Sequence, residues 1–106
     1  MKAYVYPAVF HPNSDGSFTI LYPDLPGCIS EGKSLENALY MAQDALTQWM
    51  AYSVDAGEEI PAASRLRDVS VDTKAGEFAN LIRAELGSGR ASKQNANVPK
   101  RRMLYA

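Results

Sequence analysis

The chain has 106 residues, 46% of them hydrophobic, which is enough for one small domain with a modest core. Its single cysteine and single histidine exclude an intramolecular disulfide and a structural zinc site. No apolar run approaches the about 18 residues of a membrane span, and the N-terminal segment lacks the features of a signal peptide, so we expect a cytoplasmic protein that does not enter membranes.

Charge is distributed unevenly along the chain. Residues 1–82 hold 5 lysines and arginines against 11 aspartates and glutamates, a net charge of −6. Residues 83–106 hold 6 lysines and arginines and a single glutamate, a net charge of +5. An acidic body with a basic tail favours two partners of opposite charge, although a solvated body with a random tail has the same composition.

The first two predicted strands are Ala3–Phe10 and Ser17–Tyr22, both rich in β-branched and aromatic residues. Gly16 supplies the positive φ of the hairpin loop between them. Pro7 predicts that the first strand lies at a sheet edge or a bulge. Both faces of this strand are apolar, one through Tyr4, Tyr6, Ala8 and Phe10 and the other through Val5, Pro7 and Val9. One helix covers only one face of so small a sheet, so we expect the chain to form a homodimer or a higher oligomer.

The sequence YPDLPGCISE, residues 22–31, follows the second strand. Pro23 and Pro26 fix φ and remove two backbone donors, so this segment is predicted to be a rigid corner. A short third strand, Cys28–Glu31, comes next. No positive charge adjoins Cys28, and we therefore interpret it as a buried structural thiol.

A helix is predicted over residues 34–56. Ser34 is a favourable N-cap, Glu36 lies in the first turn, and Gly57 suits the position after the helix. Its predicted apolar face consists of Leu35, Ala38, Leu39, Ala42, Ala45, Leu46 and Trp49.

The rest of the body is predicted as a loop over residues 58–75, with one helical turn near Ser64–Asp68, followed by a fourth strand, Glu77–Ala84. The fold class is therefore α+β: a small, mainly antiparallel sheet with one long helix packed on it, in the order β-β-β-α-β. We assign residues 1–86 to the domain, 87–92 to a flexible linker and 93–106 to a flexible basic tail.

No pattern in the sequence points to catalysis, a cofactor or a metal site. His11 is expected in an exposed hairpin loop without a nucleophile nearby. The aspartates are scattered over loops, whereas a metal-dependent nuclease needs carboxylates on its core strands. We therefore expect no enzyme, and a remnant nuclease is the weakest of the functional alternatives.

The tail has a pattern that suits DNA. Residues 93–98 alternate, and Pro99 could open a helix, as in a two-stranded ribbon that lies in the major groove. Such a ribbon would present Lys93, Asn95 and Asn97 to base edges. Positive charges near the phosphates would come from Lys100, Arg101 and Arg102. A disordered basic tail is the alternative interpretation, and these residues by themselves favour it.

Residues Tyr6–Leu46 resemble the HicB antitoxin family. The resemblance rests on an aromatic-Pro-Ala first strand, a Gly-containing turn, the PDLPGC corner, a Ser-Glu-Gly turn and an amphipathic helix. It extends over roughly residues 2–84, and it implies a partial ribonuclease-H-like fold without catalytic carboxylates. It further implies that the chain binds and silences a HicA-like toxin, a basic protein that cleaves mRNA. Toxin contacts are then expected at the corner and at neighbouring acidic positions: Tyr22, Asp24, Leu25, Pro26, Glu31 and Glu36.

Many members of this family add a DNA-binding domain that represses their own operon. Residues 93–104 resemble the first strand and first helical turn of the ribbon-helix-helix type, but the chain stops at Ala106. We therefore expect a chain that is either shortened or carries a vestigial domain. The alternative function is a DNA-binding transcriptional regulator whose N-terminal domain serves dimerisation.

Overall fold

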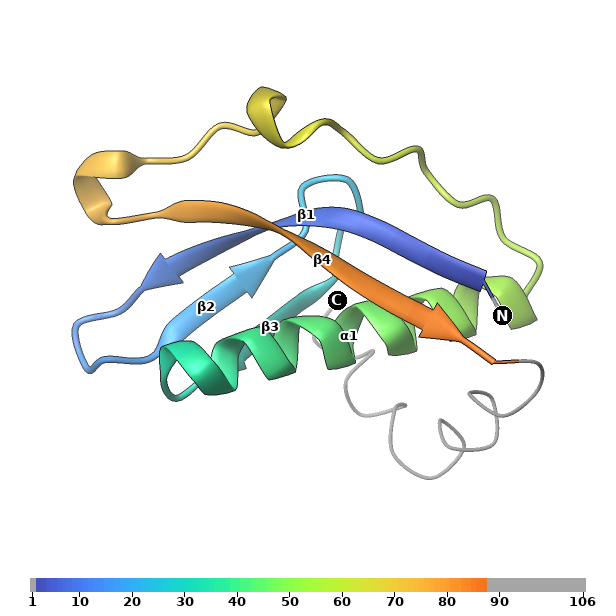
Figure 1. The fold of residues 1–106 in the computed structure, drawn as a ribbon, viewed down its shortest axis with the longest axis horizontal. Helices are drawn as coiled ribbons and strands as arrows, with labels where there is room; N and C mark the ends of the chain where they lie inside the picture. The colour runs from blue at the N-terminus through green and yellow to red at the C-terminus, as the bar shows by residue number, and fades with distance from the viewer. Residues whose placement is uncertain (1, 88–106) are drawn as a thin grey trace.

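The computed structural model describes residues 2–87, which form a four-stranded sheet and one long helix (Figure 1). The strands and the helix follow in the order β1, Lys2–Pro12; β2, Phe18–Leu21; β3, Ile29–Gly32; α1, Leu35–Asp55; and β4, Phe78–Leu86. The predicted α+β class and the β-β-β-α-β order are therefore confirmed. The predicted linker and tail residues from 88 onward lie outside the described residues, so the domain boundaries stay a prediction.

All neighbouring strands are antiparallel, in the order β3-β2-β1-β4. β1 is thus an interior strand, and the prediction that Pro7 marks an edge is wrong for the strand as a whole. It holds locally, because the pairing with β2 ends at Val9, and Pro7 is paired only with Leu81 of β4. A proline is tolerated here because its missing N–H faces no partner strand.

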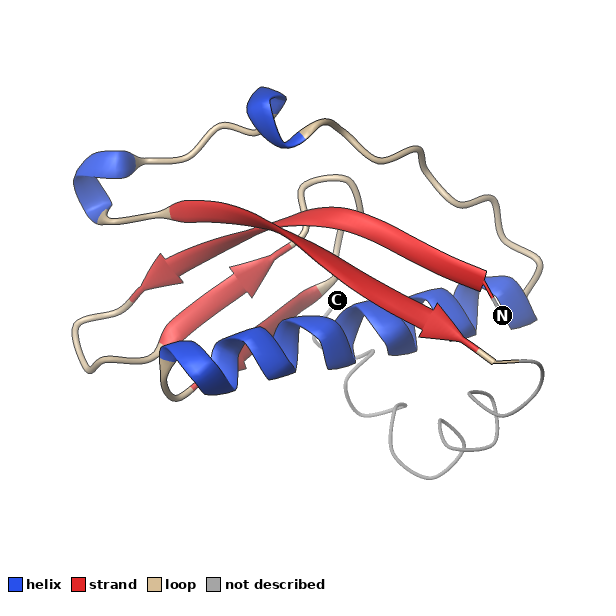
Figure 2. Cartoon of the chain, viewed as in Figure 1, coloured by secondary structure: helices blue, strands red, loops and turns tan. Residues whose placement is uncertain are grey.

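The helix packs across one face of the sheet (Figure 2). Side chains alternate along each strand, and Tyr6, Ala8 and Phe10 of β1, which were predicted to share one face, point toward the helix. Phe10 stacks on Phe78 of β4, with ring centroids 5.0 Å apart. The remaining core comes from the other strands, the corner and the helix: Ile20, Tyr22, Leu25, Cys28, Ala38, Ala42, Ala45, Leu46, Met50, Ile82 and Ala84.

The helix begins and ends as its capping residues predict. The Ser34 side chain accepts a hydrogen bond from the Asn37 N–H, and Gly57 follows the helix with a φ of 70°. The predicted apolar face is correct in its middle, but Leu35 and Leu39 are exposed and Met50 is buried instead.

The contact between β3 and α1 is unusually close at Gly32. A Cβ atom on Gly32 would overlap the backbone of Ala38. The glycine is required at this position by space, because its own φ is not in the left-handed region.

The proline-rich corner is held by its own backbone hydrogen bonds. The Leu25 N–H donates to the Tyr22 carbonyl, and the Cys28 N–H donates to the Leu25 carbonyl. Gly27 has a φ of 92°, which a residue with a side chain rarely adopts. The corner is therefore a rigid link between β2 and β3, and Leu25 at its centre is buried in the core.

A long connection, residues 56–77, returns from the end of α1 to the start of β4. In the view of Figure 1 it runs along the upper side of the molecule, past the corner between β2 and β3. Hydrogen bonds tie its first half to the rest of the domain at two points: the Tyr6 hydroxyl donates to the Pro61 carbonyl, and Ser64 donates to the Asp24 carboxylate. The predicted helical turn is present at Leu66–Asp68, and a second turn at Thr73–Ala75, capped by Asp72, was not predicted.

Candidate partner-binding surface

The face of the sheet turned away from α1 is covered by no α-helix among the described residues. We call it the open face. The strand registers place Ile29, Leu21, Val9 and Ala79 in one row across all four strands. The same alternation adds Val5 and Pro7 from β1, and Leu81 from β4.

The apolar side chains of the open face are only partly covered. Pro7 and Val9 are buried at its centre, but the four around them stay exposed. Their exposed fractions are 43% for Val5, 38% for Leu21, 39% for Ile29 and 47% for Leu81. A contiguous apolar patch of this kind on a small domain is typical of an interaction surface.

Charged groups lie at the margins of the open face. Glu31 lies on β3 beside Thr19, and no described residue forms an ion pair with its carboxylate. At the same end of the sheet, His11 lies within β1, so the prediction that it lies in a hairpin loop is wrong, and its Nδ1 is 2.8 Å from the Glu77 carboxylate. On β4, Arg83 and Glu85 pair with each other at 2.7 Å.

Glu77 is held as a carboxylate by its surroundings. Its pKa lies below the usual glutamate value, chiefly because the Asp72 N–H donates to it and also because His11 contacts it. The pairing fixes the start of β4 against the end of β1. This margin of the open face is therefore set by contacts within the domain.

Two of the six residues predicted to contact the toxin are buried. The exposed fractions of Tyr22 and Leu25 are 2% and 1%. The Tyr22 hydroxyl donates to the Ala42 carbonyl of α1, and burial raises the pKa of this hydroxyl well above its usual value. In this structure these two side chains support the corner from within, and contact by them stays an untested prediction.

The other four predicted contacts are at the surface, in two groups. Asp24 and Pro26 lie on the corner, where the Asp24 carboxylate accepts hydrogen bonds from the Ser64 N–H at 2.8 Å and hydroxyl at 2.6 Å. Glu31 and Glu36 lie near the opposite end of β3, where the chain turns into α1. The structure therefore does not bring the predicted residues into one patch.

Ile29 and Leu21 lie on the open face between these two groups, and sequence reasoning did not select them. The alternation of apolar residues along the strands could have identified Ile29 and Leu21, because the same alternation predicts a second apolar face on β1. The residues proposed for DNA contact, 93–102, lie outside the described residues.

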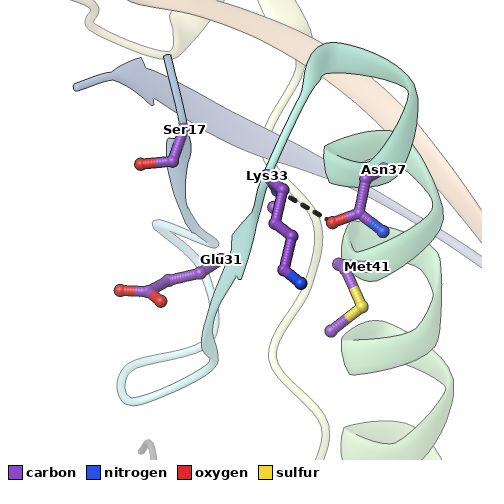
Figure 3. A pocket seen from close by; sticks show the side chains of 6 residues that line it. Ser17, Glu31, Lys33, Asn37 and Met41 are labelled. Carbon is purple, nitrogen blue, oxygen red and sulfur yellow. Dashed lines mark hydrogen bonds between the residues drawn. The ribbon is translucent and has the colours of Figure 1, made fainter. Parts of the chain in front are cut away.

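A pocket of about 290 Å³ lies between β3 and the first turns of α1 (Figure 3). Asn37 and Met41 project into it from the helix, and Lys33 lies between them and the strand. Glu31 points away from the helix on the other side of β3. The remaining lining residues are Ser17 and Gly32.

No catalytic arrangement is apparent among the described residues. Within residues 2–87, no three histidine, cysteine, aspartate or glutamate side chains gather in a way that could hold a metal ion. Cys28 is buried as predicted, and burial raises the pKa of its thiol to about 12, so it is a poor nucleophile at neutral pH. No helix in this part of the chain is long and apolar enough to cross a membrane.

Comparison with protein families gives a match to "HicB_like antitoxin of bacterial toxin-antitoxin system" over residues 6–103. Two relatives from Photorhabdus laumondii are antitoxin HicB 1, 34% identical over 56 residues, and antitoxin HicB 2, 31% identical over 77 residues. These alignments cover 53% and 73% of the chain. They cover only 36% and 55% of the relatives, so the chain spans about half of their length or less.

Two solved structures share the fold. A toxin-antitoxin complex from Streptococcus pneumoniae contains a chain that matches with a TM-score of 0.72 and 18% identity, covering 91% of this chain and 88% of that one. A HicA3 and HicB3 toxin-antitoxin complex contains a chain with a TM-score of 0.64 and 17% identity, covering 78% of this chain and all of that one. At these identities the likeness concerns the fold alone.

Proposed function

Because the chain belongs to the HicB_like antitoxins of bacterial toxin-antitoxin systems, we propose that it binds and neutralises a HicA-like toxin by covering it, without catalysis of its own. The structural relatives support a protein partner, because both matching chains come from structures described as toxin-antitoxin complexes.

The observation that carries this proposal furthest is the open face. A domain with one helix and four strands buries one side of its sheet and leaves apolar side chains on the other. A partner that covers Val5, Leu21, Ile29 and Leu81 removes this surface from water, which stabilises the complex by the hydrophobic effect. Neutralisation then requires only that the bound antitoxin block the approach of RNA to the toxin.

Charge favours a basic partner. The net charge of −6 on residues 1–82 includes the carboxylates of Asp24, on the corner that precedes β3, and of Glu31, near the end of β3. Complementary charge speeds association and makes it sensitive to salt. We therefore expect the association rate to fall as the salt concentration rises, with a smaller change in the dissociation rate.

The test is co-expression of the chain with the product of the neighbouring toxin gene, followed by co-purification and by a growth assay. We expect a stable complex at low salt and rescue of growth. Leu21→Ala should raise the Kd about tenfold, because it removes apolar contact area. Tyr40→Ala, which removes a more exposed side chain from α1, should leave the Kd unchanged. The absence of a complex at low salt would rule out the proposed function.

A second proposed function concerns operator DNA. The net charge of +5 on residues 83–106 and the alternating Lys93, Asn95 and Asn97 favour DNA contact by a longer form of the chain that completes a ribbon-helix-helix domain. Such a form would repress its own operon as a dimer. A mobility-shift titration on the promoter upstream of the gene tests this, and an extended form that fails to bind would contradict the ribbon assignment.

A further inference from the structure

The two outer edges of the sheet differ in how their backbone groups are satisfied. On the edge strand β4, the Leu81 N–H donates to the Asn80 side chain at 2.9 Å. The Arg83 carbonyl accepts from the Gln43 side chain of α1 at 2.8 Å. The domain's own side chains thus occupy the middle of this edge, which protects it against pairing with another strand.

The other edge strand, β3, has no such protection at its centre. The Tyr22 N–H donates to the Cys28 carbonyl, so the backbone groups of Cys28, Ser30 and Gly32 face β2. Because these groups alternate in direction along a strand, those of Ile29 and Glu31 face outward. No described strand pairs with them, since β2 is the only strand beside β3 among the described residues.

The open part of this edge has a defined end. The Lys33 N–H, the next outward group, donates to the Asn37 side chain at 2.8 Å (Figure 3). Beyond it the chain enters α1. The unpaired stretch therefore offers two N–H groups and two carbonyls, next to the pocket lined by Asn37 and Met41.

The chemistry of this edge selects an extended peptide segment. Two donors and two acceptors at strand spacing are matched by the backbone of another strand. A second copy of β3 is a poorer match. The antiparallel register that uses both residues places Ile29 opposite Glu31, which gives neither an apolar contact nor an ion pair. The register that places Glu31 opposite the Glu31 of the other copy pairs Ile29 with Lys33, whose N–H is already bonded. Like charges directly opposite each other destabilise a sheet.

We propose that β3 extends the sheet by pairing with a strand of the toxin partner, and that this strand carries a lysine or arginine two residues before an apolar residue. In an antiparallel pair, the basic side chain then lies opposite Glu31 and the apolar one opposite Ile29. This inference rests on the proposed function for the identity of the partner. It adds the site of contact and the sequence pattern that fits it.

Proline substitution tests the edge, because proline removes the outward N–H and blocks close approach of a strand. We compare Glu31→Pro with Glu31→Ala, so that the loss of the carboxylate is common to both. Glu31→Pro should bind the toxin about tenfold more weakly than Glu31→Ala. On the protected edge, Arg83→Pro and Arg83→Ala should bind equally. Equal binding by the two Glu31 variants, with wild-type binding intact, would overturn the edge proposal and leave the proposed function standing.

Amide hydrogen exchange in the complex provides a test without substitution. The Ile29 and Glu31 amides should exchange rapidly in the free protein and at least about tenfold more slowly when the toxin is bound. Unchanged exchange on binding would overturn the proposal. Protection in the free protein that increases with its concentration would assign the edge to a second copy and would also overturn it.

Discussion

The two faces of the sheet are built by the same strands and are apolar along the same stretch of β1, yet they have different environments. Phe10 and Ile20, on the face beneath α1, are fully buried. Leu21 and Leu81, on the open face, keep 38% and 47% of their surface in water. Strand alternation thus divides the apolar residues between two faces, but the number of helices decides how many faces the domain covers.

The largest difference in the free energy of unfolding is expected when one residue on each face of the sheet is replaced. Phe10→Ala should lower the free energy of unfolding by about 3–5 kcal/mol, because it leaves a cavity under α1 and removes the stacking on Phe78. Leu81→Ala should lower it by about 0.5 kcal/mol, since the side chain is already half solvated. Urea unfolding measures both. Equal losses would show that the open face is as well packed as the covered one.

The next effect concerns how closely the helix approaches the sheet. Gly32→Ala should destabilise the domain by about 2–3 kcal/mol, because the added methyl group overlaps the Ala38 backbone and pushes α1 away from β3. Gly16→Ala is the control: it has a positive φ but open space around it, so it should cost about 1 kcal/mol. A Gly32→Ala variant as stable as wild type would show that α1 moves without cost.

A smaller loss of stability is expected in the connection between α1 and β4. Asp24→Ala removes the acceptor of both Ser64 hydrogen bonds and should lower the free energy of unfolding by about 1 kcal/mol. Limited proteolysis should then cleave residues 58–72 faster, because one of the two ties of this segment is lost. Asp15→Ala, in the exposed hairpin loop, should leave the rate of cleavage in this segment unchanged.

The smallest effect is a pH dependence at the margin of the open face. The lowered pKa of Glu77 means that its carboxylate stabilises the folded state above the pKa of an unfolded glutamate. This contribution is lost as the pH falls through the lower pKa of the folded state. Glu77→Gln should therefore reduce the loss of stability between pH 7 and pH 3. Glu59→Gln, at an exposed glutamate with no hydrogen bond among the described residues, should not change it.

Local patterns predicted the elements, because alternation, caps and turn residues act over a few positions. They could not place contacts between distant segments, such as His11 with Glu77 or Asp24 with Ser64, since these depend on how strands register. The resemblance led us to expect toxin contacts at Tyr22 and Leu25, but large apolar residues suit cores and interfaces equally well, so sequence alone could not show that these two side chains are buried in the free domain. Burial, which only the fold determines, separates the two roles.

The pairing of β1 with β4 joins the first and last strands of the domain, from Lys2 with Leu86 to Phe10 with Phe78. The longest ladder in the sheet thus consists of contacts with high sequence separation, which slow the search for the folded state. During synthesis, β1 can pair with β2 early but must wait for β4 until nearly the whole domain has been made. Until then its far side stays unpaired, and the growing chain is exposed to aggregation for most of its translation.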